Sequence, residues 1–162
     1  MTTALELIRK YQESSPVDVE GLIRSFGLEL VKSRDLDGAI LGQITPNDNG
    51  SFTITVNKAD HYFRQRFTMA HELGHYLMHR HLIGTGVDDN VAYRSTDAGS
   101  YYNLRIKQTH EVQANQFAAH LLMPTQLVKE EWERLKPDFK AMAREFQVSP
   151  AAMRIRIEGM GL

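Results

Sequence analysis

The strongest constraint on this chain lies in its middle, where residues 64–79 contain His71-Glu72-Leu73-Gly74-His75. In a helix, side chains four positions apart point in nearly the same direction, one turn from each other. The imidazoles of His71 and His75 can therefore reach a single metal ion. Glu72 points about 100° away from them and is free to act on a water molecule instead. The pattern is typical of metal-dependent peptide hydrolysis.

The residues around this motif indicate a buried helix, which we place at residues 60–81. Apolar or small residues recur at spacings of three and four: Phe67, Ala70, Gly74, Leu77 and Met78. A glycine inside a helix costs about 1 kcal/mol relative to alanine. We therefore expect Gly74 to mark the close approach of a neighbouring strand or of a substrate backbone.

The composition restricts the kinds of site and partner that this chain can have. Its 162 residues favour a single domain or one domain with a small appendage, and the absence of cysteine excludes disulfides and thiolate zinc sites. A metal would have to be held by histidine and carboxylate ligands. The net charge of −1 does not favour nucleic acid as a partner.

The sequence shows no signal for a membrane. Residues 1–25 lack a basic start followed by an apolar run, and no apolar stretch approaches the 18 residues of a membrane span. The lack of cysteine fits a reducing compartment. We therefore expect a cytoplasmic protein with no membrane partner.

The first third of the chain predicts two helices followed by a small sheet. Residues 3–13 and 16–26 have apolar side chains at helical spacing, whereas residues 28–31, 38–44 and 52–57 have the patterns of strands. We expect an α+β fold in which a small antiparallel three-stranded sheet packs on helices. An edge strand of this sheet can bind a substrate by strand addition, or the sheet only covers the motif helix.

A second helix, predicted at residues 108–123, offers a third metal ligand. Glu111 would complete a set of two histidines and one glutamate, which leaves one coordination position for water, as in catalytic zinc sites. His110 and His120 are alternative ligands, and a glutamate near a helix start is also favourable to the helix dipole alone. Asn115 can hydrogen-bond to one of the ligands.

Between the two helices, residues 83–107 form a long irregular stretch, which in a compact domain is usually functional or disordered. Peptide hydrolysis needs a group that stabilises the developing oxyanion. The candidates are Tyr93, Arg94, Tyr101, Tyr102, Arg105 and, just beyond the stretch, His110. The sequence does not choose among them.

The end of the chain predicts three more helices, over residues 125–135, 138–146 and 150–158. The short break at residues 147–149 resembles the turn of a helix-turn-helix, and the segment is mildly basic. No basic stripe is present, so the sequence does not favour direct contact with DNA. We expect residues 125–162 to pack on the domain formed by residues 1–124.

Three segments together resemble the ImmA/IrrE family of metallo-endopeptidases. They are residues 64–79 (RQRFTMAHELGHYLMH), residues 111–124 (EVQANQFAAHLLMP) and residues 146–156 (FQVSPAAMRIR). The first two are far more specific together than the His-Glu-x-x-His pattern alone. The resemblance spans most of the chain and weakens across residues 83–107.

The resemblance implies that His71, His75 and Glu111 hold the metal and that Glu72 is the catalytic base. Zinc is the expected ion, although such a ligand set also accepts manganese, iron or cobalt. Residues 1–124 would form a zincin-like metallopeptidase domain, similar to thermolysin at its metal site.

The resemblance also implies a class of partner. Known members of the family cleave helix-turn-helix repressors and so release gene expression, and some belong to toxin–antitoxin pairs. The expected substrate is therefore a helix-turn-helix repressor or an antitoxin. The family often has acidic residues where this chain has Gln113 and His120. These two departures leave the metal ligands intact and bear on the substrate.

A second interpretation is a non-proteolytic regulator or toxin that binds a repressor or antitoxin partner. Its metal would be structural, and a structural zinc site is usually closed by four protein ligands. His79, His110 and His120 are the candidates for a fourth ligand. In the first interpretation, His79 is instead structural or lines the edge of the site.

Overall fold

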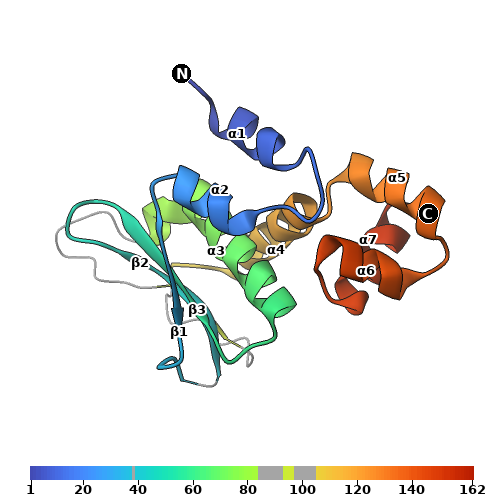
Figure 1. Cartoon of the computed structure of the whole chain (residues 1–162). Helices are drawn as coiled ribbons and strands as arrows, with labels where there is room; N and C mark the ends of the chain where they lie inside the picture. The colour runs from blue at the N-terminus through green and yellow to red at the C-terminus, as the bar shows by residue number, and fades with distance from the viewer. Residues whose placement is uncertain (38, 84–92, 97–104) are drawn as a thin grey trace.

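The motif helix α3 (Tyr62–Ile83) has other elements packed along it in the computed structural model of the chain (Figure 1). The structure describes residues 1–37, 39–83, 93–96 and 105–162. The sheet covers one side of α3, and helices α2 (Val19–Ser25) and α4 (Gln108–Leu122) cover others. The predicted helix at residues 60–81 is therefore present, shifted by two residues.

Two short helices precede the sheet, as the sequence predicts. Helix α1 (Ala4–Tyr11) begins with a capping box, in which Thr3 and Glu6 satisfy each other's backbone N–H groups. Asp18 caps α2 by accepting a hydrogen bond of 2.9 Å from the backbone N–H of Gly21. Helix α1 has no fully buried residue, whereas α2 buries Val19, Leu22 and Ile23 in the core.

The sheet contains four strands in the order β1-β3-β2-β4. They are β1 (Glu29–Ser33), β2 (Ile40–Pro46), β3 (Phe52–Asn57) and β4 (Tyr93–Thr96). Strands β2 and β3 form an antiparallel hairpin in which Ile44 lies opposite Ile54. Both side chains are fully buried in the hydrophobic cluster that includes Met69 of α3.

The α+β class is confirmed, but the sheet differs from the expected antiparallel arrangement of three strands. Strand β1 pairs with β3 in parallel, and β4 adds a fourth strand beside β2. The hairpin turn joins β2 to β3 locally, and β3 then fills the place between β2 and β1. A period of two in the sequence marks a strand but does not identify its neighbours.

Helix α4 lies unusually close to the motif helix at Gly74. A side-chain carbon added to Gly74 would lie 3.0 Å from Cδ1 of Phe117 and 3.4 Å from Cα of Ala114. The glycine therefore does mark a close approach, but the neighbour is a helix rather than a strand or a substrate.

Three C-terminal helices complete the described part of the chain. They are α5 (Thr125–Leu135), α6 (Phe139–Phe146) and α7 (Pro150–Gly159). Gln147 follows α6 in the left-handed conformation, with φ of 52°, and Ser149 caps α7. The chain therefore has the short turn between two helices that the sequence predicts.

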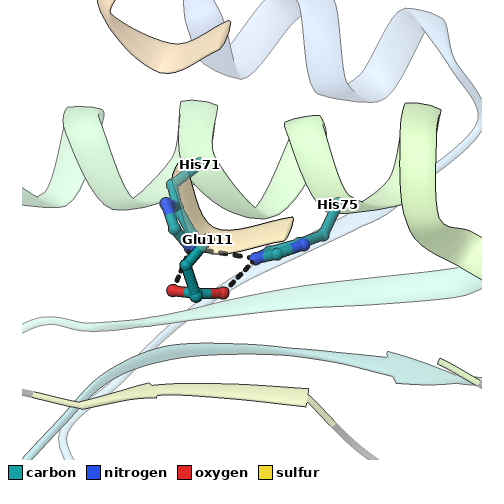
Figure 2. A group of neighbouring side chains, drawn as sticks. All are labelled: His71, His75 and Glu111. Atoms are coloured by element: carbon teal, nitrogen blue, oxygen red, sulfur yellow. Dashed lines mark hydrogen bonds and ion pairs between the residues drawn. The ribbon is translucent and has the colours of Figure 1, made fainter. Parts of the chain in front are cut away.

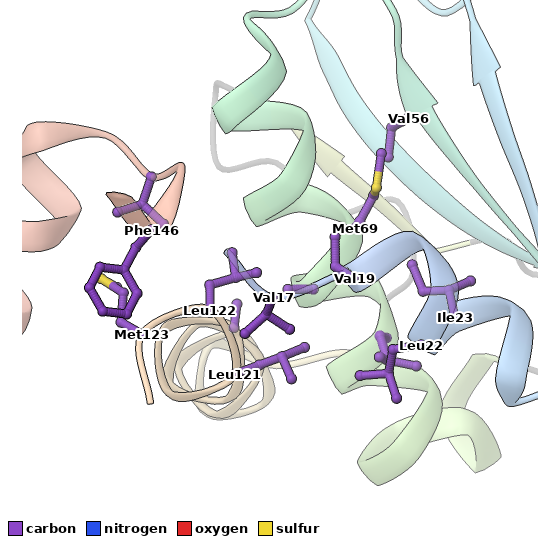
Figure 3. Packing of buried hydrophobic residues seen from close by; sticks show 14 of the residues in the cluster. Val17, Val19, Leu22, Ile23, Val56, Met69, Leu121, Leu122, Met123 and Phe146 are labelled. Atoms are coloured by element: carbon purple, nitrogen blue, oxygen red, sulfur yellow. The ribbon is translucent and has the colours of Figure 1, made fainter. Parts of the chain in front are cut away.

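The hydrophobic core runs without a break from the sheet to the C-terminal helices. Phe146 of α6 lies against Met123 at the end of α4, and the same cluster reaches Val17 and Val56 (Figure 3). The division at residue 124 stays a prediction. None of the described helices combines the length and apolar composition that a membrane span requires.

A buried arginine also links distant segments of the chain. Arg66 of α3 is 3% exposed and donates hydrogen bonds to the carbonyl oxygens of Val17, at 2.9 Å, and Gln147, at 3.3 Å. These two carbonyls precede α2 and follow α6. One side chain of the motif helix therefore holds both the N-terminal and the C-terminal helices.

The contact at Gly74 predicts a loss of stability when this residue is enlarged. Gly74→Val should lower the free energy of unfolding by about 1–3 kcal/mol, because the added carbons force α3 and α4 apart. Urea denaturation followed by circular dichroism measures this. Gly159→Val is the matched control, since a side-chain carbon at Gly159 meets no atom within 4 Å. Equal effects of the two substitutions would contradict the prediction.

Candidate metal centre

Two histidines of α3 and one glutamate of α4 converge on a single point (Figure 2). The Nε2 atoms of His71 and His75 are 3.1 Å apart. Oε1 of Glu111 lies 2.7 Å from Nε2 of His75, and Oε2 lies 3.4 Å from Nε2 of His71. All three residues are buried. The structure thus brings together the three residues that the sequence predicts as metal ligands.

The spacing of these atoms fits a metal ion. Two ligand atoms bound to a tetrahedral zinc ion at about 2.0–2.1 Å lie roughly 3.4 Å from each other. The observed separations of 2.7, 3.1 and 3.4 Å are close to this value, so small outward movements would make room for an ion. Three protein ligands leave a fourth position open, as in catalytic sites.

The close approach of the two helices places these ligands. Gly74 precedes His75, and Ala114, which it faces, lies one turn after Glu111 on α4. Because Gly74 has no side chain, α4 comes near enough for the short carboxylate of Glu111 to reach both imidazoles. The helix that supplies two ligands therefore also fixes the distance to the third.

Electrostatics gives the two histidines different protonation behaviour. Burial, together with the neighbouring charge of His71, lowers the pKa of His75 to about 4, although the hydrogen bond to Glu111 acts in the opposite direction. Burial also disfavours the charged form of His71. There, however, the hydrogen bond to Glu111 and the charges of Glu72 and Glu111 prevail, so the pKa of His71 is raised. A metal ion would displace the proton that His71 shares with Glu111.

Two further residues that the sequence singles out, Asn115 and Glu72, lie next to the candidate ligands. Asn115 accepts a hydrogen bond of 2.8 Å from Nδ1 of His71, on the ring edge away from the ligand atom. Glu72 follows His71 on α3 and is fully buried beside the centre. Its carboxylate is near enough to His71 to raise the pKa of that imidazole.

The other candidate ligands do not join the group. Nδ1 of His79 lies 2.9 Å from Nδ1 of His75, on the opposite ring edge from the ligand atom of His75. The Nδ1 of His110 accepts a hydrogen bond of 2.9 Å from the backbone N–H of Lys107. His120 is on the surface, at a groove beside α7. Within residues 1–37, 39–83 and 105–162, three candidate ligands therefore converge and no fourth joins them.

The candidates for stabilising an oxyanion fall mostly outside the described residues. This applies to Tyr101 and Tyr102 and to the side chains of Tyr93 and Arg94. Arg105 donates a hydrogen bond of 2.9 Å to the carbonyl oxygen of His81. The ring of His110 lies beside that of His79, with ring centroids 4.8 Å apart and ring planes at 58° to each other. The assignment of this role stays a prediction.

A largely apolar groove of about 660 Å³ lies beside the centre, between α3, α4 and α7. One wall of the groove contains two residues next to the candidate metal ligand His71. Phe67 lies one turn before His71 on α3, and Asn115 is the hydrogen-bond partner of His71. Ala152 and Ile155 of α7 belong to the opposite wall. No pattern in the sequence predicts this groove, because its walls come from segments that are distant along the chain.

Comparison with known proteins shows similarity to one family of peptidases. The profile of the family Peptidase_M78, described as the IrrE N-terminal-like domain, matches residues 23–158. The radiation response metalloprotease IrrE of Deinococcus radiodurans is 37% identical over 102 residues, which are 63% of this chain and 27% of that protein. IrrE of Deinococcus deserti is 37% identical over 90 residues, 56% of this chain and 29% of that protein.

The chain thus spans rather more than a quarter of the length of these relatives. A solved structure of a transcriptional regulator from Mycobacterium tuberculosis is also similar, with a TM-score of 0.63 and 19% sequence identity. The alignment covers 96% of this chain and 46% of that one. At this identity the likeness concerns the fold alone.

The geometry predicts that metal binding depends on Glu111. Glu111→Ala should weaken binding by more than the roughly 10–100-fold that loss of a ligand's hydrogen-bond partner costs. Elemental analysis and competition with a chromogenic chelator measure the metal content and the dissociation constant. The matched control is Glu133→Ala on the surface of α5, which should bind one ion per chain like the unaltered protein. Undiminished binding by Glu111→Ala would exclude this residue as a ligand.

Proposed function

The chain belongs to the peptidase family of IrrE N-terminal-like domains, and from this premise we propose that it is a zinc-dependent endopeptidase. The observation that carries the proposal is the buried group of His71, His75 and Glu111, which leaves a fourth coordination position open. These three residues would hold the ion through two nitrogens and a carboxylate, and they would leave one coordination position for the water and the substrate.

The ion and Glu72 divide the work of hydrolysis between them. When bound, zinc polarises the scissile carbonyl and lowers the pKa of a water at the open position towards about 7. Glu72 accepts a proton from the attacking water and later delivers it to the nitrogen of the leaving amine. Its place directly after His71 on α3 keeps it beside the ligands without making it one.

The substrate that we propose is a helix-turn-helix transcriptional repressor, whose cleavage relieves repression. The support is the resemblance of residues 64–79 and 111–124 to the ImmA/IrrE peptidases. The groove along α3, α4 and α7 provides apolar walls for an extended segment of such a substrate next to the scissile bond.

Substitution of Glu72 tests the proposed chemistry. Glu72→Gln keeps the size of the side chain but cannot accept the proton, so the rate of cleavage should fall by about 10²–10⁴-fold while metal binding is retained. The assay uses the helix-turn-helix repressor encoded nearest to the gene and follows its fragments by mass spectrometry. Glu133→Gln serves as the matched surface control and should cleave at the unaltered rate.

The outcomes separate the two interpretations of the sequence. Cleavage that needs both metal and Glu72 supports the peptidase. Metal binding without cleavage, together with a stable complex between the chain and the repressor, would instead support a non-proteolytic regulator or toxin. Cleavage by Glu72→Gln at the unaltered rate would show that Glu72 is not the base.

A further inference from the structure

His79 lies between the metal ligand His75 and a side chain of the neighbouring helix. It is 4% exposed and stands one turn after His75 on α3. Its Nδ1 is 2.9 Å from Nδ1 of His75, and its Nε2 is 2.7 Å from Oε1 of Gln113 on α4. The three side chains therefore form a hydrogen-bonded row that begins at the surface with Gln113, an exposed residue, and ends at the ligand.

The amide oxygen of Gln113, at the outer end of the row, determines which atom donates and which accepts in each hydrogen bond. The amide oxygen of Gln113 can only accept a hydrogen bond, so Nε2 of His79 carries the proton. In a neutral imidazole the other nitrogen is then an acceptor. Nδ1 of His79 must therefore accept from Nδ1 of His75. Each contact along the row from Gln113 to His75 then has one donor and one acceptor, with both histidines neutral.

The consequence for His75 is a single tautomer. With its proton on Nδ1, the lone pair of His75 lies on Nε2, which is 2.7 Å from Oε1 of Glu111. Both atoms are then acceptors, and a metal ion bound between them would supply the cation that they need. The reverse order of donors would put the proton on Nε2 and close His75 to metal.

His71, the other proposed histidine ligand, is held in the same tautomer by a direct hydrogen bond to an amide. The amide oxygen of Asn115 accepts directly from Nδ1 of His71, at 2.8 Å, and so leaves Nε2 of His71 for the metal. Asn115 and Gln113 are two residues apart on α4. Helix α4 thus supplies one carboxylate ligand and two amide oxygens, one for each imidazole. For His75, the amide of Gln113 acts through His79, which lies between them.

We propose that His79 is a positioning residue that holds His75 in its metal-binding tautomer, and that Gln113 in turn holds His79. This inference rests on the proposed function, because it concerns the same metal centre. It gives His79 a definite role in place of a general structural one. It also gives a role to Gln113, which occupies a position where the family often has an acidic residue.

The test compares substitutions that remove or retain an acceptor. His79→Leu removes the acceptor for His75, whereas His79→Asn places an amide oxygen where Nδ1 of the imidazole was. Chelator competition with zinc alone should show a roughly 10–100-fold larger dissociation constant for His79→Leu, and recovery of most of the affinity in His79→Asn. Circular dichroism checks that both variants are folded.

A second pair of variants changes an exposed residue, Gln113, and not a core residue. Gln113 is exposed, so its replacement leaves the packing of α3 and α4 intact. Gln113→Leu should weaken zinc binding, whereas Gln113→Glu keeps an acceptor and should bind like the unaltered protein. Nitrogen-15 NMR of the imidazoles gives a direct readout. It should show His75 protonated on Nδ1 in the unaltered protein with zinc bound, and a mixture of tautomers in His79→Leu and Gln113→Leu at the same zinc concentration.

The results distinguish failure of the inference from failure of the proposed function. Equal zinc affinity and an unchanged tautomer of His75 in both leucine variants would overturn the role of His79. Equal loss in the leucine variants and their acceptor-bearing partners would also overturn it, because packing alone would then explain the effect. Absence of zinc binding by the unaltered protein would overturn both. A zinc-binding protein with the expected tautomers and no cleavage would uphold the inference and reject the peptidase.

Discussion

The close approach of α3 and α4 at Gly74 is the constraint on which the metal centre depends. Contact of this kind is available only where one helix lacks a side chain, since a carbon at this position would meet Phe117 at 3.0 Å. The same contact sets the reach of Glu111, which starts from the first turn of α4. The helical cost of the glycine, about 1 kcal/mol, is therefore offset by the packing that it permits.

The three buried histidines of α3, His71, His75 and His79, are tolerated because each has a hydrogen-bond partner on α4. Unpaired polar groups in an interior cost about 1–3 kcal/mol, so a helix with several buried histidines requires a polar neighbour. Helix α4 meets this requirement with Glu111, Asn115 and Gln113. These hydrogen bonds also explain why the sequence of α4 is only weakly amphipathic, because the face of α4 that packs on α3 contacts polar as well as apolar groups.

The spacing of residues within one helix made the grouping of the two histidines predictable, whereas contacts between distant segments could not be predicted from the sequence. The separation of four residues between His71 and His75 follows from helix geometry alone, and Glu111 stands on a helix that the sequence also shows. The parallel pairing of β1 with β3, the partners of Arg66 and the contact between His79 and Gln113 all join distant segments. Residue patterns within one segment carry no information on such partners. The catalytic and ligand roles themselves stay predictions.

The hydrogen bonds of Arg66 have a consequence for how the molecule comes apart. Its guanidinium serves a carbonyl ahead of α2 and another beyond α6, so departure of either segment leaves a buried cation with a missing acceptor. A lost partner of a buried charged group costs more than the roughly 1–3 kcal/mol typical of neutral ones. Fraying at either terminus is thereby penalised at the motif helix. The two ends and the helix between them are expected to melt as one cooperative unit.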